Sequence, residues 1–294
     1  MRPKPVILYF EDEQRTALQL AALTDWACAQ IERHRFPDGE LKLRLPASVP
    51  NRVVLLRSLS QPNEKLLEVL LAVQTARALG AQHVTLVSPY LAYMRQDMAF
   101  VPGEAVSQRI VGQFLASMLD ALVTVDPHLH RIAKLEEVID VPQVTVLSGA
   151  PLLADWIAKQ HAQPFLVGPD SESAQWVAQA AQAHGFDHAV CNKVRHGDRA
   201  VTIALPAVDV HSRNVVLLDD MASSGRTLAG AARQLLAAGA ASVDVGVTHA
   251  LFTADALEVM AQAGVSHVWS TDCVSHATNV VSIMPAVAQA LTQA

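Results

Sequence analysis

The sequence of 294 residues is poor in aromatic residues (5%), contains only three cysteines and has no long apolar run. Cys28, Cys191 and Cys273 lie far apart and form no CxxC pair, so nothing indicates a zinc site or a disulfide framework. The apolar run at 6–10 is too short for a signal peptide or a membrane span. We therefore expect a cytoplasmic protein that does not bind membranes.

The sequence also lacks an excess of positive charge and the common phosphate-binding motifs. Its formal net charge is −6, which argues against a nucleic-acid partner or a membrane-surface role but not against a local anion site. Neither a P-loop nor a GxGxxG motif after a strand occurs. Apolar residues make up 51% of the chain and charged residues 17%, which is typical of a folded globular protein.

Short apolar runs alternate with helical patterns along the chain. The runs lie at 6–10, 53–56, 84–88, 122–125, 144–147, 165–168, 201–205, 215–218 and 243–247. The helical patterns lie at 64–79, 106–119, 174–184, 227–238 and 254–263, and several end at a glycine (Gly80, Gly185, Gly239, Gly264), as left-handed caps do. This alternation predicts an α/β fold in which mainly parallel sheets are flanked by helices.

The number of predicted strands exceeds what one sheet of this type holds comfortably. A break near residues 148–151 divides the strands into two roughly equal halves, although no strong sequence repeat relates them. We therefore expect two α/β domains. The first covers residues 1–148, with the tail at 281–294 as a possible completion, and the second covers residues 149–280.

The segment 215–228, VVLLDDMASSGRTL, runs from an apolar strand into two adjacent carboxylates and a loop of small residues. Neighbouring like charges repel each other and are costly to bury without a partner. The amides and hydroxyls of residues 223–227, just before a predicted helix, would bind a phosphate. We therefore expect Asp219 and Asp220 to face sugar hydroxyls or a water-bridged Mg²⁺, rather than to be exposed beside an ordinary helix cap.

Four other polar segments are predicted at the ends of strands or in the loops that follow them. They are Arg95–Asp97, Asp126–His128, Pro169–Asp170 and Lys193–Arg195. In open α/β sheets ligands bind beyond the carboxyl ends of the strands. Each segment alone reads as a solvated turn, but five polar segments in one register predict a ligand site.

The segment DDMASSGRT resembles the binding motif for phosphoribosyl diphosphate (PRPP) that phosphoribosyltransferases share with PRPP synthetases. Other segments resemble the synthetases, which are also called ribose-phosphate diphosphokinases. They are FPDGE at 36–40, PYLAYMRQDMAFVPGEAVS at 89–107, TVDPH at 124–128, GPD at 168–170 and the pair Lys193-x-Arg195. The continuation FVPGE is most similar to archaeal-type members. Together these segments follow the family order and identify the sequence as a member of that family.

The resemblance implies two phosphoribosyltransferase-like domains and a diphosphoryl transfer from ATP to ribose 5-phosphate with Mg²⁺ as the cofactor. The implied residues are Lys193 and Arg195 for catalysis; Phe36, Asp38, Glu40, Arg95, Gln96 and Asp97 for ATP; Asp219, Asp220, Ser223, Ser224, Gly225 and Thr227 for ribose 5-phosphate; and His128 and Asp170 for the metal. The Phe36 segment is implied to complete the site of a neighbouring copy, so we expect a homodimer or a higher homo-oligomer.

The sequence departs from the family pattern at three places. Arg226 stands where glycine is commoner, Glu172-Ser173 replaces a glycine pair, and His130-Arg131 follows the Asp-x-His segment. Two alternatives stay open. A phosphoribosyltransferase that consumes PRPP would need only the motif at 215–228, and a non-catalytic regulatory subunit would have no reason to keep Lys193 and Arg195.

Overall fold

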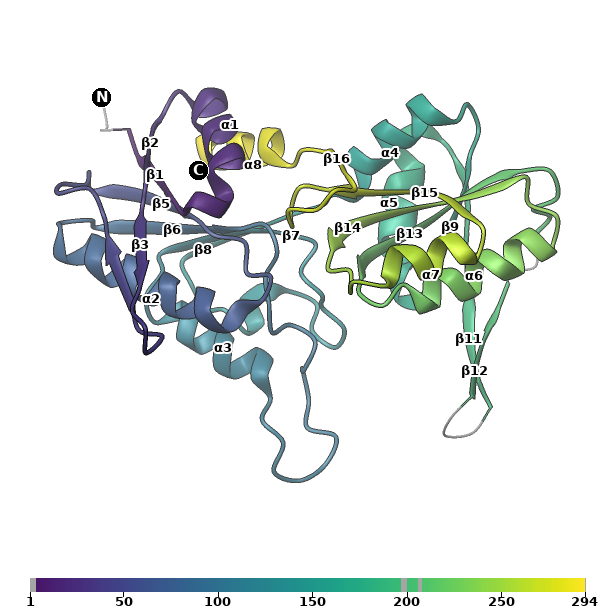
Figure 1. Cartoon of the computed structure of the whole chain (residues 1–294), viewed down its shortest axis with the longest axis horizontal. Helices are drawn as coiled ribbons and strands as arrows, with labels where there is room; N and C mark the ends of the chain where they lie inside the picture. Colours follow the sequence, from purple (N-terminus) through teal and green to yellow (C-terminus); the bar gives the residue numbers. More distant parts are fainter. Residues whose placement is uncertain (1–3, 197–199, 206–207, 294) are drawn as a thin grey trace. The chain divides into compact units, whose positions relative to one another are not determined.

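The computed structural model describes residues 4–196, 200–205 and 208–293, which form two compact units (Figure 1). Unit 1 comprises residues 1–147 and 284–294, and unit 2 comprises residues 148–283. Each unit contains a six-stranded parallel sheet flanked by helices, which confirms the predicted α/β fold. The division falls between Leu147 and Ser148, and the last helix belongs to unit 1.

The sheet of unit 1 has the strand order β2-β1-β5-β6-β7-β8. Its strands are β1 (Val6–Tyr9), β2 (Ala27–Gln30), β5 (Arg52–Leu56), β6 (His83–Ser88), β7 (Ala121–Val125) and β8 (Gln143–Leu147). Helices α1 (Gln14–Thr24) and α8 (Met284–Gln293) cover one face, and α2 (Pro62–Ala78) and α3 (Ser107–Ala116) cover the other (Figure 1). Two 3-10 turns, η1 (Glu11–Glu13) and η2 (Leu135–Glu137), and an antiparallel hairpin of β3 (Glu32–Arg35) and β4 (Leu41–Arg44) complete the unit.

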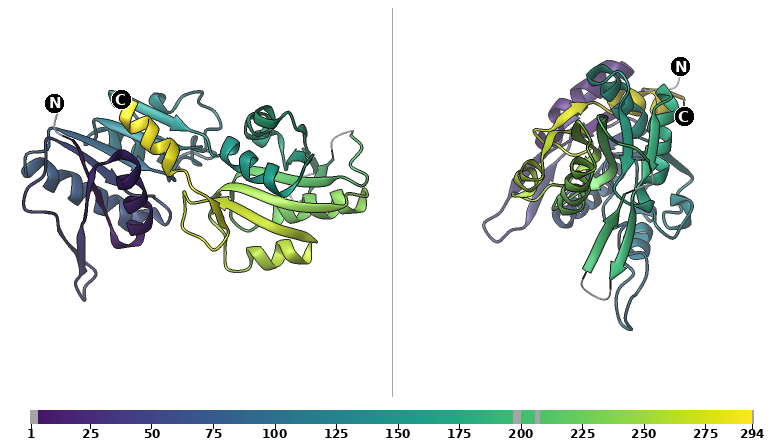
Figure 2. Two further views of the ribbon diagram at one scale, coloured as in Figure 1. Left: turned by 90° about the horizontal axis from the view of Figure 1, so that it is seen from above. Right: turned by 90° about the vertical axis from the view of Figure 1, so that its right-hand side faces the viewer.

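The sheet of unit 2 has the order β10-β9-β13-β14-β15-β16. Its strands are β9 (Phe165–Gly168), β10 (Asp187–Val190), β13 (Asn214–Ala222), β14 (Ser242–Ala250), β15 (Val265–Thr271) and β16 (Asn279–Val281). The helices are α4 (Ala150–Gln160), α5 (Ala174–His184), α6 (Arg226–Ala237) and α7 (Ala256–Gln262), with the 3-10 turn η3 (Ser171–Ser173) before α5. An antiparallel hairpin of β11 (Asn192–His196) and β12 (Ala200–Ala204) extends beyond the sheet (Figures 1 and 2).

Alternate residues of the central strands of unit 2 enter two separate cores, one on each face of the sheet. Leu166, Val216 and Leu218 pack with α4 and α5. Val215 and Leu217 pack with α6 and α7. Strands that are buried on both faces have to be apolar throughout, which is why VVLL at 215–218 shows no polar alternation.

The predicted strands and helices are found close to their expected bounds, with one difference. The run at 201–205 belongs to hairpin strand β12 and not to the parallel sheet. The glycines that follow α2, α5, α6 and α7 all have positive φ, from +67° to +103°, which confirms the predicted left-handed helix ends.

The two units have the same topology, although no sequence repeat predicted it. In chain order, each sheet has the arrangement second, first, third, fourth, fifth and sixth strand, and each has its hairpin between the second and third strands. The order reverses between β1 and β5 in unit 1 and between β9 and β13 in unit 2. In parallel α/β sheets such a reversal opens a crevice at the carboxyl ends of the two strands, where ligands bind.

In unit 1 a buried arginine directly follows β5 at this reversal point. The guanidinium of Arg57, which is 1% exposed, lies 2.7 Å from Asp12 and 3.3 Å from Glu13, and it also pairs with the fully buried Glu68. The guanidinium carbon of Arg57 lies 4.5 Å from the centre of the Phe10 ring. The buried guanidinium is thus paired within the chain, and such a pair is costly to break from one side only.

The same network makes unit 1 sensitive to pH. Burial raises the pKa of Glu13 to about 7, although Arg57 and the Ser58 amide oppose this rise. The folded protein therefore keeps a proton that the unfolded chain loses from its ordinary value of 4.5 upward. We expect the free energy of unfolding to fall between about pH 5 and pH 7, by at most about 3 kcal/mol, and not to recover above that window.

The variant Glu13→Gln should lack this part of the pH dependence. Urea unfolding of both proteins across the window measures the difference. Parallel pH profiles for the wild-type protein and the variant would contradict the prediction.

Candidate functional site

Three carboxylates lie at the reversal point of unit 2. Asp170 follows β9 by two positions, and Asp219 and Asp220 lie on the last half of β13. Asp170 and Asp220 are buried and Asp219 is half-buried. The backbone amide of Asp220 donates to the Asp219 carboxylate at 3.0 Å, and the amide of Glu172 donates to Asp170 at 3.0 Å. The structure thus brings together three of the residues that the sequence singled out.

These carboxylates repel one another. Burial, followed by the charges of Asp220 and Asp170, raises the pKa of Asp219 well above its ordinary value. The nearby thiol of Cys191 is affected in the same direction, because burial and then Asp170 raise its pKa to about 11. The edge of the sheet therefore has an affinity for positive charge or for hydroxyl donors.

The strand register shows that the two units carry residues of opposite charge at the corresponding position of their sheets. Val53 and Val215 pair with the first residues of β1 and β9, respectively. Arg57 follows Val53 by four residues, as Asp219 follows Val215. The position that carries a paired guanidinium in unit 1 therefore carries a carboxylate in unit 2.

The loop after β13 leads directly into α6. The residue before the helix is Gly225, with φ +67°, which has no side chain that could cap the first turn. A Cβ at this position would lie 3.1 Å from the carbonyl oxygen of Ala256, so both the conformation and the space favour glycine. Neither Ser224 nor Thr227 is therefore the cap residue of α6.

Two of the departures from the family pattern have a local explanation here. Arg226 is the exposed first residue of α6. The pKa of Asp255 is lowered mainly by hydrogen bonds from Thr253 and from its own backbone, and the charge of Arg226 lowers it further. Ser173 is fully buried, and its hydroxyl donates to the carbonyl of Asp170 at 2.6 Å. It fills the space beside Gly168, where a Cβ would lie 2.2 Å from the Ser173 hydroxyl oxygen.

Lys193 and Arg195 lie on strand β11, where they pair in register with Ile203 and Val201 of β12. This hairpin connects the second and third strands of the sheet of unit 2, and residues 197–199, between β11 and β12 in sequence, lie outside the described residues. The side chains of Lys193 and Arg195 also lie outside the described part.

In unit 1 the predicted nucleotide residues lie on two segments. Phe36, Asp38 and Glu40 form the exposed turn of the β3–β4 hairpin, which the amide of Phe36 closes by donating to the carbonyl of Glu40 at 2.9 Å. The Phe36 side chain is 38% exposed and lies edge-on to His34, which excludes a core role within this unit. Ion pairs of Arg33 with Glu68 and of Arg35 with Glu64 hold the hairpin against α2.

The second segment is the long loop between β6 and α3, which protrudes from unit 1 in Figure 1. Arg95 is exposed and Gln96 is half-buried, but the carboxylate of Asp97 is buried and paired with Arg131 at 2.6 Å. No local pattern predicts this contact, because 34 positions separate the two residues. His128 is half-buried in the loop after β7, two residues beyond Asp126, whose φ is +36°.

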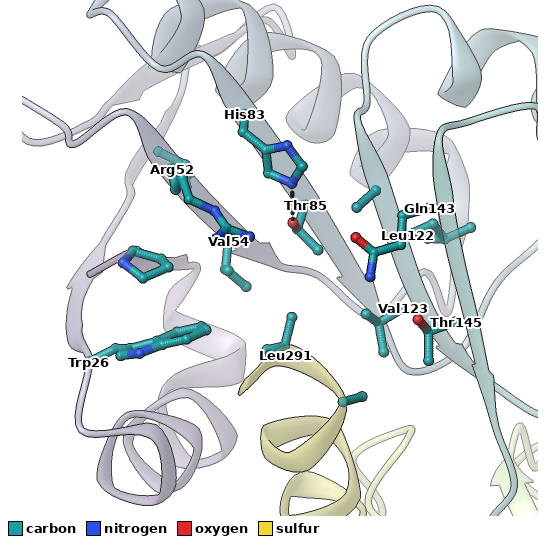
Figure 3. A pocket seen from close by; sticks show the side chains of 14 residues that line it. Trp26, Arg52, Val54, His83, Thr85, Leu122, Val123, Gln143, Thr145 and Leu291 are labelled. Carbon is teal, nitrogen blue, oxygen red and sulfur yellow. Dashed lines mark hydrogen bonds between the residues drawn. The ribbon is translucent and has the colours of Figure 1, made fainter. Parts of the chain in front are cut away.

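The cavity found in unit 1 lies away from all these residues (Figure 3). It encloses about 400 Å³ of empty space, part of it open to solvent, between the sheet and α8. Arg52, His83, Ala121 and Gln143 line it, and each is the first residue of its strand. It therefore lies at the amino edge of the sheet, opposite to the carboxyl edge that carries the predicted site. Burial lowers the pKa of His83 in this cavity.

Comparisons with known proteins extend over both units. A family model described as the N-terminal domain of ribose phosphate pyrophosphokinase matches residues 6–118, and the phosphoribosyl transferase domain matches residues 147–282. The ribose-phosphate pyrophosphokinase of Methanopyrus kandleri is 35% identical over 97% of this chain and 98% of its own length. That of Methanothermobacter thermautotrophicus is 32% identical over 95% and 96%.

A solved structure agrees with these relatives. The phosphoribosylpyrophosphate synthetase from Mycobacterium smegmatis matches with a TM-score of 0.84 and 25% identity over 98% of both chains. Two phosphoribosyltransferase-like domains are therefore the correct description of the fold. The chain belongs to the ribose-phosphate pyrophosphokinase family. The match over 6–118 is the part that a phosphoribosyltransferase alone would leave unexplained.

Within the described residues, none of the helices has the length and apolarity to span a bilayer.

The repulsion around Asp219 leads to a prediction about stability. Because the folded protein raises the pKa of this carboxyl, its ionisation destabilises the fold as the pH rises. Asp219→Asn should therefore raise the free energy of unfolding of the ligand-free protein, more at about pH 8 than at about pH 5.

Thermal unfolding at the two pH values measures this effect. Glu258→Gln, which removes an exposed carboxylate from α7, is the matched control and should change little. A lower melting temperature for Asp219→Asn at about pH 8 would contradict the prediction.

Proposed function

We propose that this protein is a ribose-phosphate diphosphokinase, which transfers the β,γ-diphosphoryl group of ATP to the 1-hydroxyl of ribose 5-phosphate and releases AMP. The observation that carries the proposal is the group of Asp170, Asp219 and Asp220 at the reversal point of unit 2, followed along the chain by a helix whose N-cap residue is a glycine. The family membership of nearly the whole chain supports it.

We assign the sugar phosphate to this edge of unit 2. Carboxylates accept hydrogen bonds only, so Asp219 and Asp220 would bind ribose hydroxyls. The amides around Gly225, together with the hydroxyls of Ser223, Ser224 and Thr227, would bind the 5-phosphate at the start of α6. Binding hydroxyl donors would also relieve the repulsion that raises the pKa of Asp219.

In the proposed reaction the 1-oxygen of ribose forms a bond to the β-phosphorus while the bond from that phosphorus to the α,β-bridging oxygen breaks. The hydroxyl proton leaves to solvent, and AMP keeps the bridging oxygen. Such transfers depend on positioning and on stabilising the charge of the phosphoryl oxygens. Lys193 and Arg195 would supply that charge, Arg195 through its planar fork and Lys193 as a point charge.

We propose Mg²⁺ as the cofactor, which when bound neutralises charge between phosphate oxygens. We propose His128 and Asp170 as its protein ligands, directly or through water. The acidic edge of unit 2 fits such an ion, because Mg²⁺ binds one or two carboxylates and completes its shell with water and phosphate oxygens. The described ranges contain no group of three acidic, histidine or cysteine side chains able to hold a metal ion by themselves.

On the nucleotide side we propose that Arg95 and Gln96 contact ATP, and that Phe36, Asp38 and Glu40 contact the ATP of a neighbouring copy. The exposure of Phe36 at a hairpin tip that ion pairs hold in place supports this assignment. An aromatic ring in such a position offers stacking area to adenine without losing contacts in its own core. The protein would then act as a homodimer or a larger homo-oligomer.

The reaction is tested by following purified protein with ATP, Mg²⁺ and ribose 5-phosphate by phosphorus NMR. We expect AMP together with a diphosphate attached to ribose carbon 1, because attack falls on the β-phosphorus. The appearance of ADP would instead mean that a single phosphoryl group is transferred. No product in metal-replete, phosphate-containing buffer would favour the transferase or the regulatory subunit.

The shared site is tested by mixing two inactive variants, Phe36→Ala and Lys193→Ala. If the Phe36 turn of one copy completes the site of another, randomly mixed assemblies contain about a quarter of native sites and recover about that share of activity. Phe36→Ala mixed with the double variant Phe36→Ala/Lys193→Ala should recover none. Equal activities of the two mixtures would refute the shared site.

A further inference from the structure

Residues 95–104, here called the nucleotide loop, are exposed but internally ordered by hydrogen bonds. Met98, Phe100 and Val101 are 36%, 63% and 57% exposed. At the tip, the Glu104 carboxylate accepts the amide of Phe100 at 2.7 Å. Near the base, the buried Gln108 donates to the carbonyl of Met94 at 3.1 Å. An exposed loop with so few core contacts needs a specific anchor to hold one conformation.

Arg131, from the loop after β7, provides such an anchor. Its guanidinium donates to Oδ1 of Asp97 at 2.6 Å and lies 5.8 Å from the centre of the Phe100 ring. The Asp97 side chain is 1% exposed, whereas that of Arg131 is 43% exposed. Oδ2 of Asp97 makes no hydrogen bond within the described part of the chain, and His130 lies 3.8 Å from it.

We propose that Arg131 is a positioning residue, which fixes the nucleotide loop through Asp97 and Phe100 and thereby sets the affinity for the adenine nucleotide. The effect of Arg131 on nucleotide affinity rests on the proposed function, in which Arg95 and Gln96 of the same loop contact ATP. Asp97 then acts through the loop conformation and not by direct contact with the nucleotide. Arg131 is also one of the residues at which the sequence departs from the family pattern.

The physical reason is the burial of the Asp97 charge. A buried carboxylate that loses its cation keeps the full cost of its desolvation. Without Arg131 the loop would have to open until water reaches Asp97, and this opening would displace Arg95 and Gln96. The contact with Phe100 also favours the anchored loop, because a cation over an aromatic face is attracted more strongly when it is partly shielded from water.

The variant Arg131→Gln tests the proposal with two measurements. We expect the KM for ATP to rise by about tenfold or more, while kcat and the KM for ribose 5-phosphate change by less than about threefold. Amide hydrogen exchange of residues 95–104 in the protein without nucleotide should become faster. The matched control is Arg77→Gln. It breaks another ion pair of unit 1, between Arg77 and Asp120, the residue that precedes β7. It should leave all these values unchanged.

A second variant separates charge balance from a general loss of structure. In Asp97→Asn/Arg131→Gln neither charge remains, so exchange of the loop and the KM for ATP should return most of the way to their wild-type values. A raised KM with unchanged exchange would mean that Arg131 touches the nucleotide itself, which would overturn the positioning role. Unchanged KM with faster exchange would overturn its link to affinity.

The failure of the proposed function would look different. In that case the wild-type protein would form no PRPP and bind no ATP in equilibrium dialysis. Faster exchange in Arg131→Gln, with recovery in the double variant, would then still support the anchor, and unchanged exchange would overturn it.

Discussion

The balance of charge at the point where strand order reverses is the constraint on which the organisation of this protein depends. Both units have the same topology, so strand order reverses at the same pair of strand ends. In unit 1 the guanidinium of Arg57 lies at this point and is paired within the chain. In unit 2 the corresponding residue is Asp219, beside Asp220 and Asp170, whose charges raise its pKa. One fold thus carries opposite charges at the same position of its two sheets.

The ion pairs of Arg57 extend to a neighbouring element of unit 1. The buried Glu68 pairs with Arg57 and at the same time with Arg33 of β3, so the charge network continues into the hairpin that carries Phe36. In unit 1 the candidate ligand residues lie on the turn of the β3–β4 hairpin and in the loops after β6 and β7. In unit 2 they lie at the end of β13 and in the loops after β9 and β13, and the hairpin with Lys193 and Arg195 projects from the sheet in Figure 1.

The sequence predicted the features that depend on local pattern. Buried strands such as 215–218 are apolar throughout, and glycines with positive φ mark the helix ends. The edge strands β2 and β10 were missed, because ACAQ and DHAV are short and largely exposed and so show no apolar run. The motif residues Asp170, Asp219 and Asp220 were predicted and do meet. The partner of Asp97 was not predictable, since no periodicity links positions 97 and 131.

The departures from the family pattern follow from the same charge and space requirements. Ser173 fills the space that Gly168 leaves open and binds the Asp170 backbone, so the loop after β9 is held without the usual glycines. Arg131 supplies the cation that a buried Asp97 requires. A buried carboxylate needs a partner wherever it occurs, and the chain provides one at Asp97 and Glu68. At Asp219 burial and the charges of Asp220 and Asp170 raise the pKa of the carboxyl, so a ligand that relieves this repulsion would stabilise the folded protein.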